Sequence, residues 1–472
     1  MPNNSCRYTK MAHKQSVMRV LITVIFLFFC YFIFSQPIQK LVPDGGGEYV
    51  YENGHENCLS DSDRSEIRSM LKTNSDLLKK TGKTPKPLEK AIINFEWPLQ
   101  KNSGLSFNNC FAISNFVDQD QSSGILDHDC GSRAYDGHNG TDVYTWPFPW
   151  YLVENDFAEV IAGADGVIIG KSDGYDDDHC SCLGTWNAVY VEHLDGSVAW
   201  YGHMKKNSLT PKLVGESVVQ GEFLGVVASS GCSSGPHLHF EVHDSADNVI
   251  DPYTGTCNSL NPTTWWASQP AYRVPTINAV LTHDAEPIHG CPGINETPNI
   301  ENTFGPGDLI YFATYYRDQM NGDISTYRIR RPNGSVWNDW TATSPATYSS
   351  SWWYWTYNLP SLGPFGTWSF EVEYNGETVS HDFLYASSTS IKENFQAQNI
   401  AIVPNPSSMG EIQIIIDNPE SVEIEIIDFK GALVKKIRSE SEKVNVKNLA
   451  TGIYSLIVRQ KNFFYSQRFI IQ

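Results

Sequence analysis

The chain has 472 residues, which is too long for one ordinary core and suggests about three domains. Hydrophobic residues make up 41% and aromatic residues 12% of a sequence with many Gly and Pro residues, a composition that favours short strands joined by tight turns. The formal charge of −19 argues against a nucleic-acid partner, which would need clustered Lys and Arg, and fits the solubility of an exported protein.

The N-terminus has the pattern of a signal peptide over residues 1–35. Four basic residues precede an apolar run from Val20 to Phe34, and Ser35 offers a small residue at a cleavage point. The run is shorter than the roughly 20 residues that a membrane-spanning helix needs. We therefore predict export without a permanent transmembrane anchor, and the alternative is an uncleaved anchor.

Eight cysteines follow the signal peptide, and an even count in an exported chain predicts a disulfide framework. The spacing specifies no pairing, except that Cys180 and Cys182 are too close to bond each other easily. The eight are Cys58, Cys110, Cys130, Cys180, Cys182, Cys232, Cys257 and Cys291.

Residues 36–90 are expected to form a short helical segment. Asp63 and Glu66 have the spacing of a capping box, an apolar stripe runs on to Leu78, and Gly82 can end a helix over residues 63–80. A Pro-rich linker follows over residues 84–87. The segment is either a packed prefix or a propeptide, and the sequence leaves both open.

Residues 91–268 have the pattern of an all-β domain. Residues 160–169 predict a strand, a turn at Asp165-Gly166 and another strand, while residues 187–201 predict a hairpin around Asp195-Gly196. A further strand is expected from His237 to His243. The fold class is therefore mainly β.

Two smaller β units are expected after this domain. Residues 271–388 hold alternating aromatic strands, in which Trp368, Phe370 and Val372 share a face, and predict an immunoglobulin-like sandwich. We expect most of its aromatic residues in the core, with glycan binding as the alternative. Residues 395–472 predict a small C-terminal β-sandwich with strands at 412–416, 422–428 and 452–458.

This last block, which opens on Val403-Pro-Asn-Pro406, resembles the C-terminal sorting domain of substrates of type IX secretion. The resemblance implies that the type IX machinery carries the chain across an outer membrane, to be released or held at the cell surface. The alternative is a second small sandwich that does not act as a secretion signal.

Three short segments concentrate histidine: His138-Asn-Gly-Thr-Asp142, Tyr201-Gly-His203-Met204 and Gly235-Pro-His237-Leu-His239-Phe-Glu-Val242. A catalytic zinc takes three protein ligands and keeps one position open for water. His138 and Asp142 can converge through a bend at Gly140, and His237 and His239 project from one strand face. Together they offer enough donors for a metal and a spare histidine for proton transfer.

These segments, in this order on a β scaffold, resemble the lysostaphin-like zinc metallopeptidases of the LytM and lysostaphin group, over residues 95–252. The resemblance implies that His138, Asp142 and His239 bind one Zn²⁺. It also implies that His237 is the general base and that His203, with the zinc, stabilises the oxyanion. Asn139 and two expanded segments, 144–157 and 173–185, depart from the family pattern and leave the substrate preference open.

Other polar residues in this region have simpler interpretations. We expect Cys180 and Cys182, next to His179, to form disulfides rather than a second metal site. The acidic run Asp176-Asp177-Asp178 lacks the spacing of a calcium loop and is expected to be solvated. His193, beside a hairpin turn, is expected to be structural.

The sequence thus predicts a secreted zinc metalloendopeptidase that hydrolyses peptide bonds in the stems or cross-bridges of peptidoglycan. One alternative is a broad-specificity secreted protease that cuts glycine-rich proteins. The other is a non-catalytic protein for cell-wall binding or adhesion.

Overall fold

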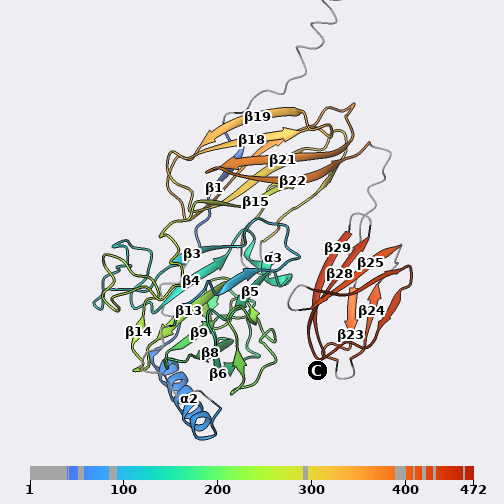
Figure 1. Ribbon diagram of the computed structural model, residues 1–472. Coiled ribbons are helices and arrows are strands. Elements are labelled where there is room, and N and C mark those ends of the chain that lie inside the picture. The colour runs from blue at the N-terminus through green and yellow to red at the C-terminus, as the bar shows by residue number, and fades with distance from the viewer. Residues whose placement is uncertain are drawn as a thin grey trace, which may run out of the picture.

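The structure is a computed structural model (Figure 1), described here for residues 40, 42–51, 58–83, 93–290, 296–387, 400–407, 410–416, 421–428, 432–460 and 463–471. The predicted signal peptide, the linker at 84–87 and Cys291 lie outside these residues. Within them the fold is mainly β, as predicted, with two helices. No helix in the described part of the chain is long and apolar enough to span a membrane.

The first body is built on a twisted antiparallel sheet whose central strand, β13, lies between β9 and β4. A hairpin of β8 and β9 turns at residues 193–197, as expected. In order across the sheet, the strands are β10 (Ser217–Val218), β6 (Gly166–Ser172), β8 (Ala188–Glu192), β9 (Val198–Gly202), β13 (His237–His243), β4 (Gly140–Thr145) and β3 (Phe111–Asn115), with β14 (Val249–Ile250) beside β13.

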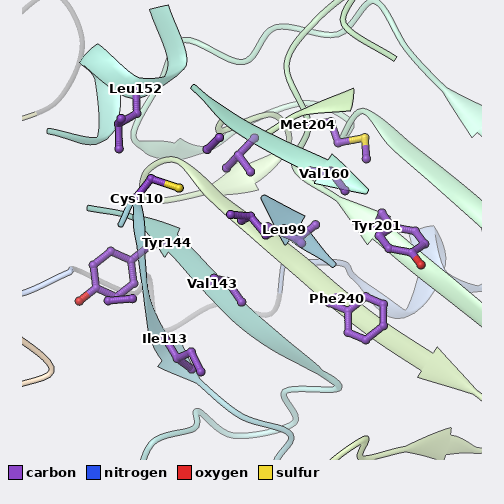
Figure 2. Packing of buried hydrophobic residues seen from close by; sticks show 14 of the residues in the cluster. Leu99, Cys110, Ile113, Val143, Tyr144, Leu152, Val160, Tyr201, Met204 and Phe240 are labelled. Carbon is purple, nitrogen blue, oxygen red and sulfur yellow. The ribbon is translucent and has the colours of Figure 1, made fainter. Parts of the chain in front are cut away.

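A three-stranded sheet completes this body on one face of the large sheet. Its strands are β11 (Phe223–Val226), β5 (Ala158–Ile161) and β2 (Leu99–Lys101). The strand, turn and strand predicted at 160–169 are therefore present as β5 and β6, but they belong to different sheets. Buried residues such as Val143, Tyr201 and Phe240 fill the space between the sheets (Figure 2).

The opposite face of the large sheet is covered by helix α2 (Asp61–Lys80). Leu71 and Leu78 of this helix pack against Tyr190 and Trp200 of the sheet. The helix begins two residues before the predicted start, because Ser60 caps it and forms the capping box with Asp63; the predicted pairing of Asp63 with Glu66 was wrong. A short helix α3 (Pro149–Glu154) lies in the expanded segment 144–157.

The second body consists of two facing, largely antiparallel sheets with a shared aromatic core in which Trp368, Phe370 and Val372 are fully buried, as expected. One sheet has the order β1 (Gly45–Glu48), β20 (Ser350–Tyr357), β17 (Ile310–Arg317) and β15 (Thr276–His283). The other has the order β16 (Thr303–Phe304), β22 (Glu377–Tyr385), β21 (Gly366–Tyr374), β18 (Ile324–Arg330) and β19 (Val336–Thr343).

The presence of β1 in this sandwich was not predicted. It comes from the N-terminal segment and adds an edge strand to β20, some 300 residues later in the chain (Figure 1). The N-terminal segment therefore begins on the sandwich and ends, as helix α2, on the first body.

The C-terminal region forms two small sheets around an aliphatic core. Their orders are β23 (Ile400–Val403), β24 (Ile412–Ile416) and β27 (Lys443–Val446), and β26 (Leu433–Ser439), β25 (Val422–Asp428), β28 (Gly452–Gln460) and β29 (Phe463–Ile471). The predicted strands at 412–416, 422–428 and 452–458 are all present.

The prediction that all eight cysteines join a disulfide framework was wrong for two of them. Cys130 bonds Cys257 and Cys182 bonds Cys232, whereas Cys58 and Cys110 are free and buried. Cys180 is also disulfide-bonded. Cys110 lies in the hydrophobic core, where burial raises the pKa of its thiol to about 12, and Cys58 lies among histidines.

Candidate active site

The candidate site is assembled around one face of strand β13. His237 and His239 are two residues apart on this strand and therefore share a face. The antiparallel register places Asp142 of β4 opposite His239 on one side and Gly202 of β9 opposite it on the other. His203 follows directly after β9, and sheet pairing thus brings all three predicted segments together.

Gly140 is needed for space rather than for a bend. A Cβ atom at this position would lie 2.6 Å from Cε1 and Nε2 of His239, so any larger residue would displace that ring. Gly140 is the first residue of β4, and the strand continues through Asp142. Gly140 therefore lies within the strand rather than at the bend that the sequence suggested, and its lack of a side chain leaves room for the His239 ring.

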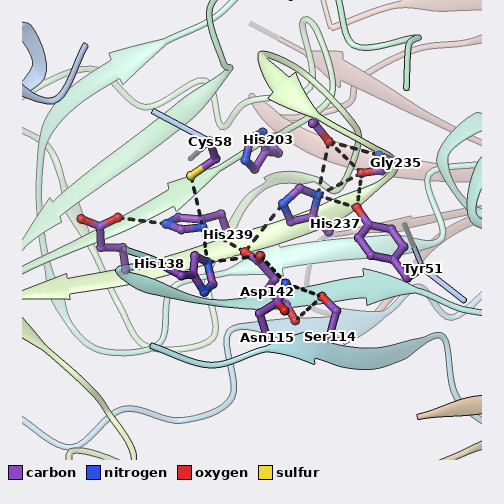
Figure 3. A network of polar contacts seen from close by, with 12 residues as sticks. Tyr51, Cys58, Ser114, Asn115, His138, Asp142, His203, Gly235, His237 and His239 are labelled. Atoms are coloured by element: carbon purple, nitrogen blue, oxygen red, sulfur yellow. Dashed lines mark hydrogen bonds and ion pairs between the residues drawn. The ribbon is translucent and has the colours of Figure 1, made fainter. Parts of the chain in front are cut away.

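Donor atoms of three residues converge at the centre of the site (Figure 3). Nε2 of His138 lies 3.2 Å from Oδ2 of Asp142 and 3.3 Å from Nδ1 of His239, and the last atom lies 2.9 Å from Oδ1 of Asp142. Ligands at zinc-bonding distance and tetrahedral angles lie about 3.3–3.5 Å from one another. The residues His138, Asp142 and His239 therefore fit a zinc ion in both chemistry and spacing.

The outer nitrogen of each of these two histidines is occupied by a second group. Nδ1 of His138 donates to the backbone carbonyl of Phe116 at 2.7 Å, and Nε2 of His239 donates to Oε2 of Glu241 at 2.9 Å. These partners select the tautomers that leave a lone pair on the inner nitrogens. Such outer hydrogen bonds are usual for histidines that bind metals.

His237 and His203 lie beside the three candidate ligands. In both rings, as in His138, Nδ1 is bonded to a backbone carbonyl and Nε2 is left to act on the site. Nδ1 of His237 donates to the carbonyl of Gly235 at 2.9 Å, and Nδ1 of His203 donates to that of Ser230 at 2.6 Å. Nε2 of His237 lies 3.7 Å from Oδ1 of Asp142, while Nε2 of His203 is buried without a partner among the described residues. His203 has a φ of 60°, an uncommon conformation for a residue other than glycine.

Burial and neighbouring charges set the protonation states of these groups. Burial alone would raise the pKa of Asp142, but His138 and His237 outweigh it and hold that pKa well below its usual range. Burial, followed by the charges of His237 and His239, holds the pKa of His203 well below its usual range. The site therefore offers an ionised carboxylate at Asp142 and a neutral imidazole at His203. Burial alone would lower the pKa of His239, but Cys58, Asp142 and Glu241 outweigh it and hold that pKa well above its usual range, so zinc binding would release a proton from this ring.

The structure also places the histidines that were not assigned to the site. His193 donates from Nδ1 to the carbonyl of Asp165 at 2.8 Å, which agrees with a structural role. Nε2 of His243 lies 2.7 Å from Oε1 of Glu241, and the ring stacks on Trp200. At the edge of the domain, Asp176 is exposed and pairs with Lys206, as expected of a solvated loop.

Sequence reasoning missed several residues that contact the site, among them Tyr51, Cys58, Arg64 and Glu241. Glu241 could have been found, because it is two positions beyond His239 on the same strand face. The other three come from the N-terminal segment, and no spacing relates them to the histidine segments.

Comparisons with known proteins agree with this organisation. Residues 152–252 match peptidase family M23, and residues 401–472 match the secretion system C-terminal sorting domain. The chain therefore contains an M23 peptidase domain and a sorting domain, and the latter indicates export. The M23 match includes His203, His237 and His239 and begins after His138 and Asp142.

Among curated proteins, the chain is 38% identical over 92 residues to the DD-carboxypeptidase/endopeptidase Mpg of Neisseria meningitidis and to that of Neisseria gonorrhoeae. The match covers 19% of this chain and 18% of those proteins, so the chain spans less than a fifth of the relatives' length.

Among solved structures, the chain is similar to the catalytic domain of the prophage-encoded M23 protein EnpA of Enterococcus faecalis, with 22% identity and a TM-score of 0.21 over 32% of this chain and 93% of that one. It is also similar to the catalytic domain of lysostaphin of Staphylococcus simulans, with 21% identity and a TM-score of 0.19 over 29% of this chain and 85% of that one.

Proposed function

We propose that this protein is an exported zinc metalloendopeptidase that hydrolyses peptide bonds in the stems or cross-bridges of peptidoglycan. The observation that carries the proposal is the convergence of donor atoms from His138, Asp142 and His239 at zinc-ligand spacing, with His203 and His237 beside them. The M23 match, which includes His203, His237 and His239, supports a peptidase, and the curated relatives are named as DD-carboxypeptidase/endopeptidases.

In this proposal His138, Asp142 and His239 hold the metal, and Asp142 contributes the negative charge that offsets the cation. When bound, zinc supplies Lewis-acid chemistry: it lowers the pKa of a water toward about 7 and polarises the peptide carbonyl. Three protein ligands leave one position for that water.

His237 is the general base in this proposal. Its Nδ1 hydrogen is held by Gly235, so its Nε2 lone pair faces the donor cluster and can accept the proton of the attacking water. The same nitrogen can then return the proton to the leaving amine.

His203 has the same arrangement, and its ring centroid lies 4.2 Å from that of His237. When one of two rings this close is protonated, its positive charge disfavours protonation of the other. The pair of His203 and His237 therefore holds at most one extra proton at a time. His203 donates to the developing oxyanion only when it holds that proton.

The sorting domain supports the type IX secretion machinery as a partner and release or surface attachment as the destination. The predicted signal peptide at residues 1–35 would provide the first export step.

Metal content and hydrolysis test this proposal together. We expect about one zinc per chain for the unaltered protein, and cleavage of purified peptidoglycan or a pentaglycine peptide once limited proteolysis has removed the N-terminal segment. His239→Ala should lose both the metal and the activity. His179→Ala, a histidine outside the cluster, serves as the matched control and should lose neither.

The outcomes separate the candidate functions. Cleavage of a glycine-rich protein such as elastin, without cleavage of peptidoglycan, would favour a broad secreted protease. A folded, trimmed protein without zinc and without cleavage of either substrate would contradict the peptidase and leave a binding or adhesion protein.

A further inference from the structure

The N-terminal segment contacts the site at three successive points on the same face of β13. Its Tyr51 hydroxyl donates to the carbonyl of Gly235 at 2.7 Å and lies 2.9 Å from Nδ1 of His237. Farther along the segment, Cys58 contacts His239 and Arg64 contacts Glu241. His237, His239 and Glu241, which share this face of β13, are thus contacted by Tyr51, Cys58 and Arg64, respectively.

Cys58 is the contact that bears on the metal. Its side chain is buried, with 7% of the residue exposed, and its Sγ lies 3.7 Å from Nδ1 of His239. A sulfur and a nitrogen bound to the same tetrahedral zinc lie about 3.6 Å apart, given zinc bonds of about 2.3 and 2.0–2.1 Å. The observed separation matches that of two ligands of one ion, and without the ion it is that of a sulfur–nitrogen hydrogen bond.

A second observation shows that this position is built to receive a ligand. Donor atoms of Cys58, His203 and His239 all lie within 4.8 Å of one another, and His239 is the residue that this group shares with a second group containing His138 and Asp142. Binding to the same ion as His138 and Asp142 therefore requires the Cys58 side chain to move toward them. His203 is 0% exposed, and its Nε2 has no hydrogen-bond partner within the described ranges. Figure 3 shows Cys58 beside His203 and above the three proposed ligands.

Two anchors hold Cys58 in this place. On one side, β1 pairs with β20 of the sandwich, and Tyr49 and Tyr51 stack on Trp146 and Tyr144 with centroids 4.5 and 4.7 Å apart. On the other side, helix α2 packs on the sheet, and Nη1 of Arg64 lies 2.6 Å from Oε1 of the fully buried Glu241. The thiol is therefore fixed from both directions along the chain.

We propose that Cys58, as a thiolate, is a fourth ligand of the zinc and that the N-terminal segment keeps the peptidase latent until it is removed or displaced. This inference rests on the proposed function. A catalytic zinc site keeps an open position for water, and a site closed by four protein ligands has none. Metal binding releases the thiol proton to solvent, and activation exchanges the thiolate for water without any change in oxidation state.

Cobalt substitution gives a readout other than activity. We expect the full-length chain loaded with Co²⁺ to show a thiolate-to-cobalt charge-transfer band, which Cys58→Ser removes while Co²⁺ remains bound. Cys110→Ala is the matched control, because Cys110 is the other free, buried cysteine and lies in the hydrophobic core. It should keep the band.

Activity of the untrimmed, zinc-loaded chain is the second readout. Cys58→Ser should raise the rate of pentaglycine hydrolysis by about tenfold or more, because altering the surroundings of a metal commonly changes activity by 10- to 100-fold. Trimmed wild-type protein should match the trimmed variant, since neither then carries the segment.

Alkylation of the unaltered chain provides a test that needs no variant. Cys58 should be protected from iodoacetamide in the zinc-loaded chain and modified after chelation, whereas Cys110 should be protected in both states, as read by peptide mass spectrometry. Equal modification of Cys58 with and without zinc would overturn the inference.

The remaining outcomes distinguish this inference from the proposed function. A chain that binds Co²⁺ without a thiolate band, and that hydrolyses peptide as fast as Cys58→Ser, overturns the latency and leaves the peptidase standing. A chain that binds no metal in any form overturns both.

Discussion

At the scale of single residues, Glu241 is the group that orients His239. Its Oε2 accepts the Nε2 hydrogen of His239, while its Oε1 pairs with Arg64 and His243. Burial alone would raise the pKa of this carboxyl, but Arg64 and the two histidines hold it well below the usual range. Glu241 is therefore a positioning residue, ionised and without contact to the proposed metal.

Glu241→Gln tests this role. The amide keeps the shape of the side chain but accepts the His239 hydrogen more weakly, and we expect zinc affinity to fall by roughly 10- to 100-fold. Competition with a chelator measures this affinity directly. Glu192→Gln is the control, because Glu192 is also buried and bonded to helix α2, through Ser75 and Lys79, but lies away from the site. Equal affinities in the two variants would contradict the assignment.

Asp251 gives a prediction about stability and pH. It is fully buried, and burial raises its pKa to about 7, against the hydrogen bonds from Tyr253 and Gln119. The folded state then binds a proton more tightly than the unfolded state, so ionisation lowers stability as pH rises from about 4 to about 7, and the loss is constant above that range. Stability relative to Asp251→Asn should fall by a few kcal/mol across this window.

Thermal unfolding of both proteins from pH 4.5 to 8 measures this difference. The change of stability with pH is compared between the two proteins, rather than the stability itself. The amide introduced by Asp251→Asn meets Gln119 and shifts the stability of the variant by an amount that does not depend on pH. Parallel curves for the two proteins would show that Asp251 does not titrate in this range.

At the scale of elements, helix α2 connects the N-terminal segment to the sheet that carries the site. Leu71 packs against the sheet and is 6% exposed, whereas Leu77 on the same helix is 59% exposed. Leu71→Ala should therefore cost about 2–4 kcal/mol of docking free energy, and Leu77→Ala almost nothing.

Hydrogen exchange of the helix and the rate of tryptic cleavage within it measure this cost. Faster exchange and cleavage are expected for Leu71→Ala alone. If both variants behave like the wild type, the helix is held by its polar contacts to Glu192 and Glu241 instead.

At the scale of the whole molecule, the first body and the sandwich share one core. Tyr144, Trp146 and Phe148 belong to the same buried cluster as Ala313 and Tyr315 of the sandwich, and the indole of Trp146 donates to the carbonyl of Tyr316 at 3.0 Å. The C-terminal region has its own core and contacts the first body through Arg468, which pairs with Glu159 and lies over the ring of Phe223.

Two truncations should therefore differ in their effect. Removal of residues 388–472 is expected to leave the melting temperature of the remainder and its zinc affinity almost unchanged, while export by the type IX machinery is lost. Removal of residues 271–472 would expose the aromatic residues at the shared core, at about 1.5–3 kcal/mol for each buried side chain, and should yield an unstable or insoluble product. A stable, zinc-binding fragment ending at residue 270 would contradict a shared core.

The sequence by itself determined the features that depend on short-range pattern. Alternation along His237–His243, the turn at Asp195-Gly196 and the strands of the C-terminal region are all present, because side-chain direction in a strand follows from residue parity. The five predicted site residues lie together, since the recognised segments are each only a few residues long. Their roles remain predictions until the metal is measured.

Only the tertiary structure decided which distant residues meet those segments. The pairing of β1 with β20, the two assigned disulfides and the approach of Tyr51, Cys58 and Arg64 to β13 each join positions between 50 and about 300 residues apart. No local period encodes such contacts; they result from how whole surfaces of sheet and helix are buried against each other. Cys58 shows the difference clearly, because the count of cysteines predicted a disulfide whereas the packing of the N-terminal segment places its sulfur beside His239, one of the proposed metal ligands.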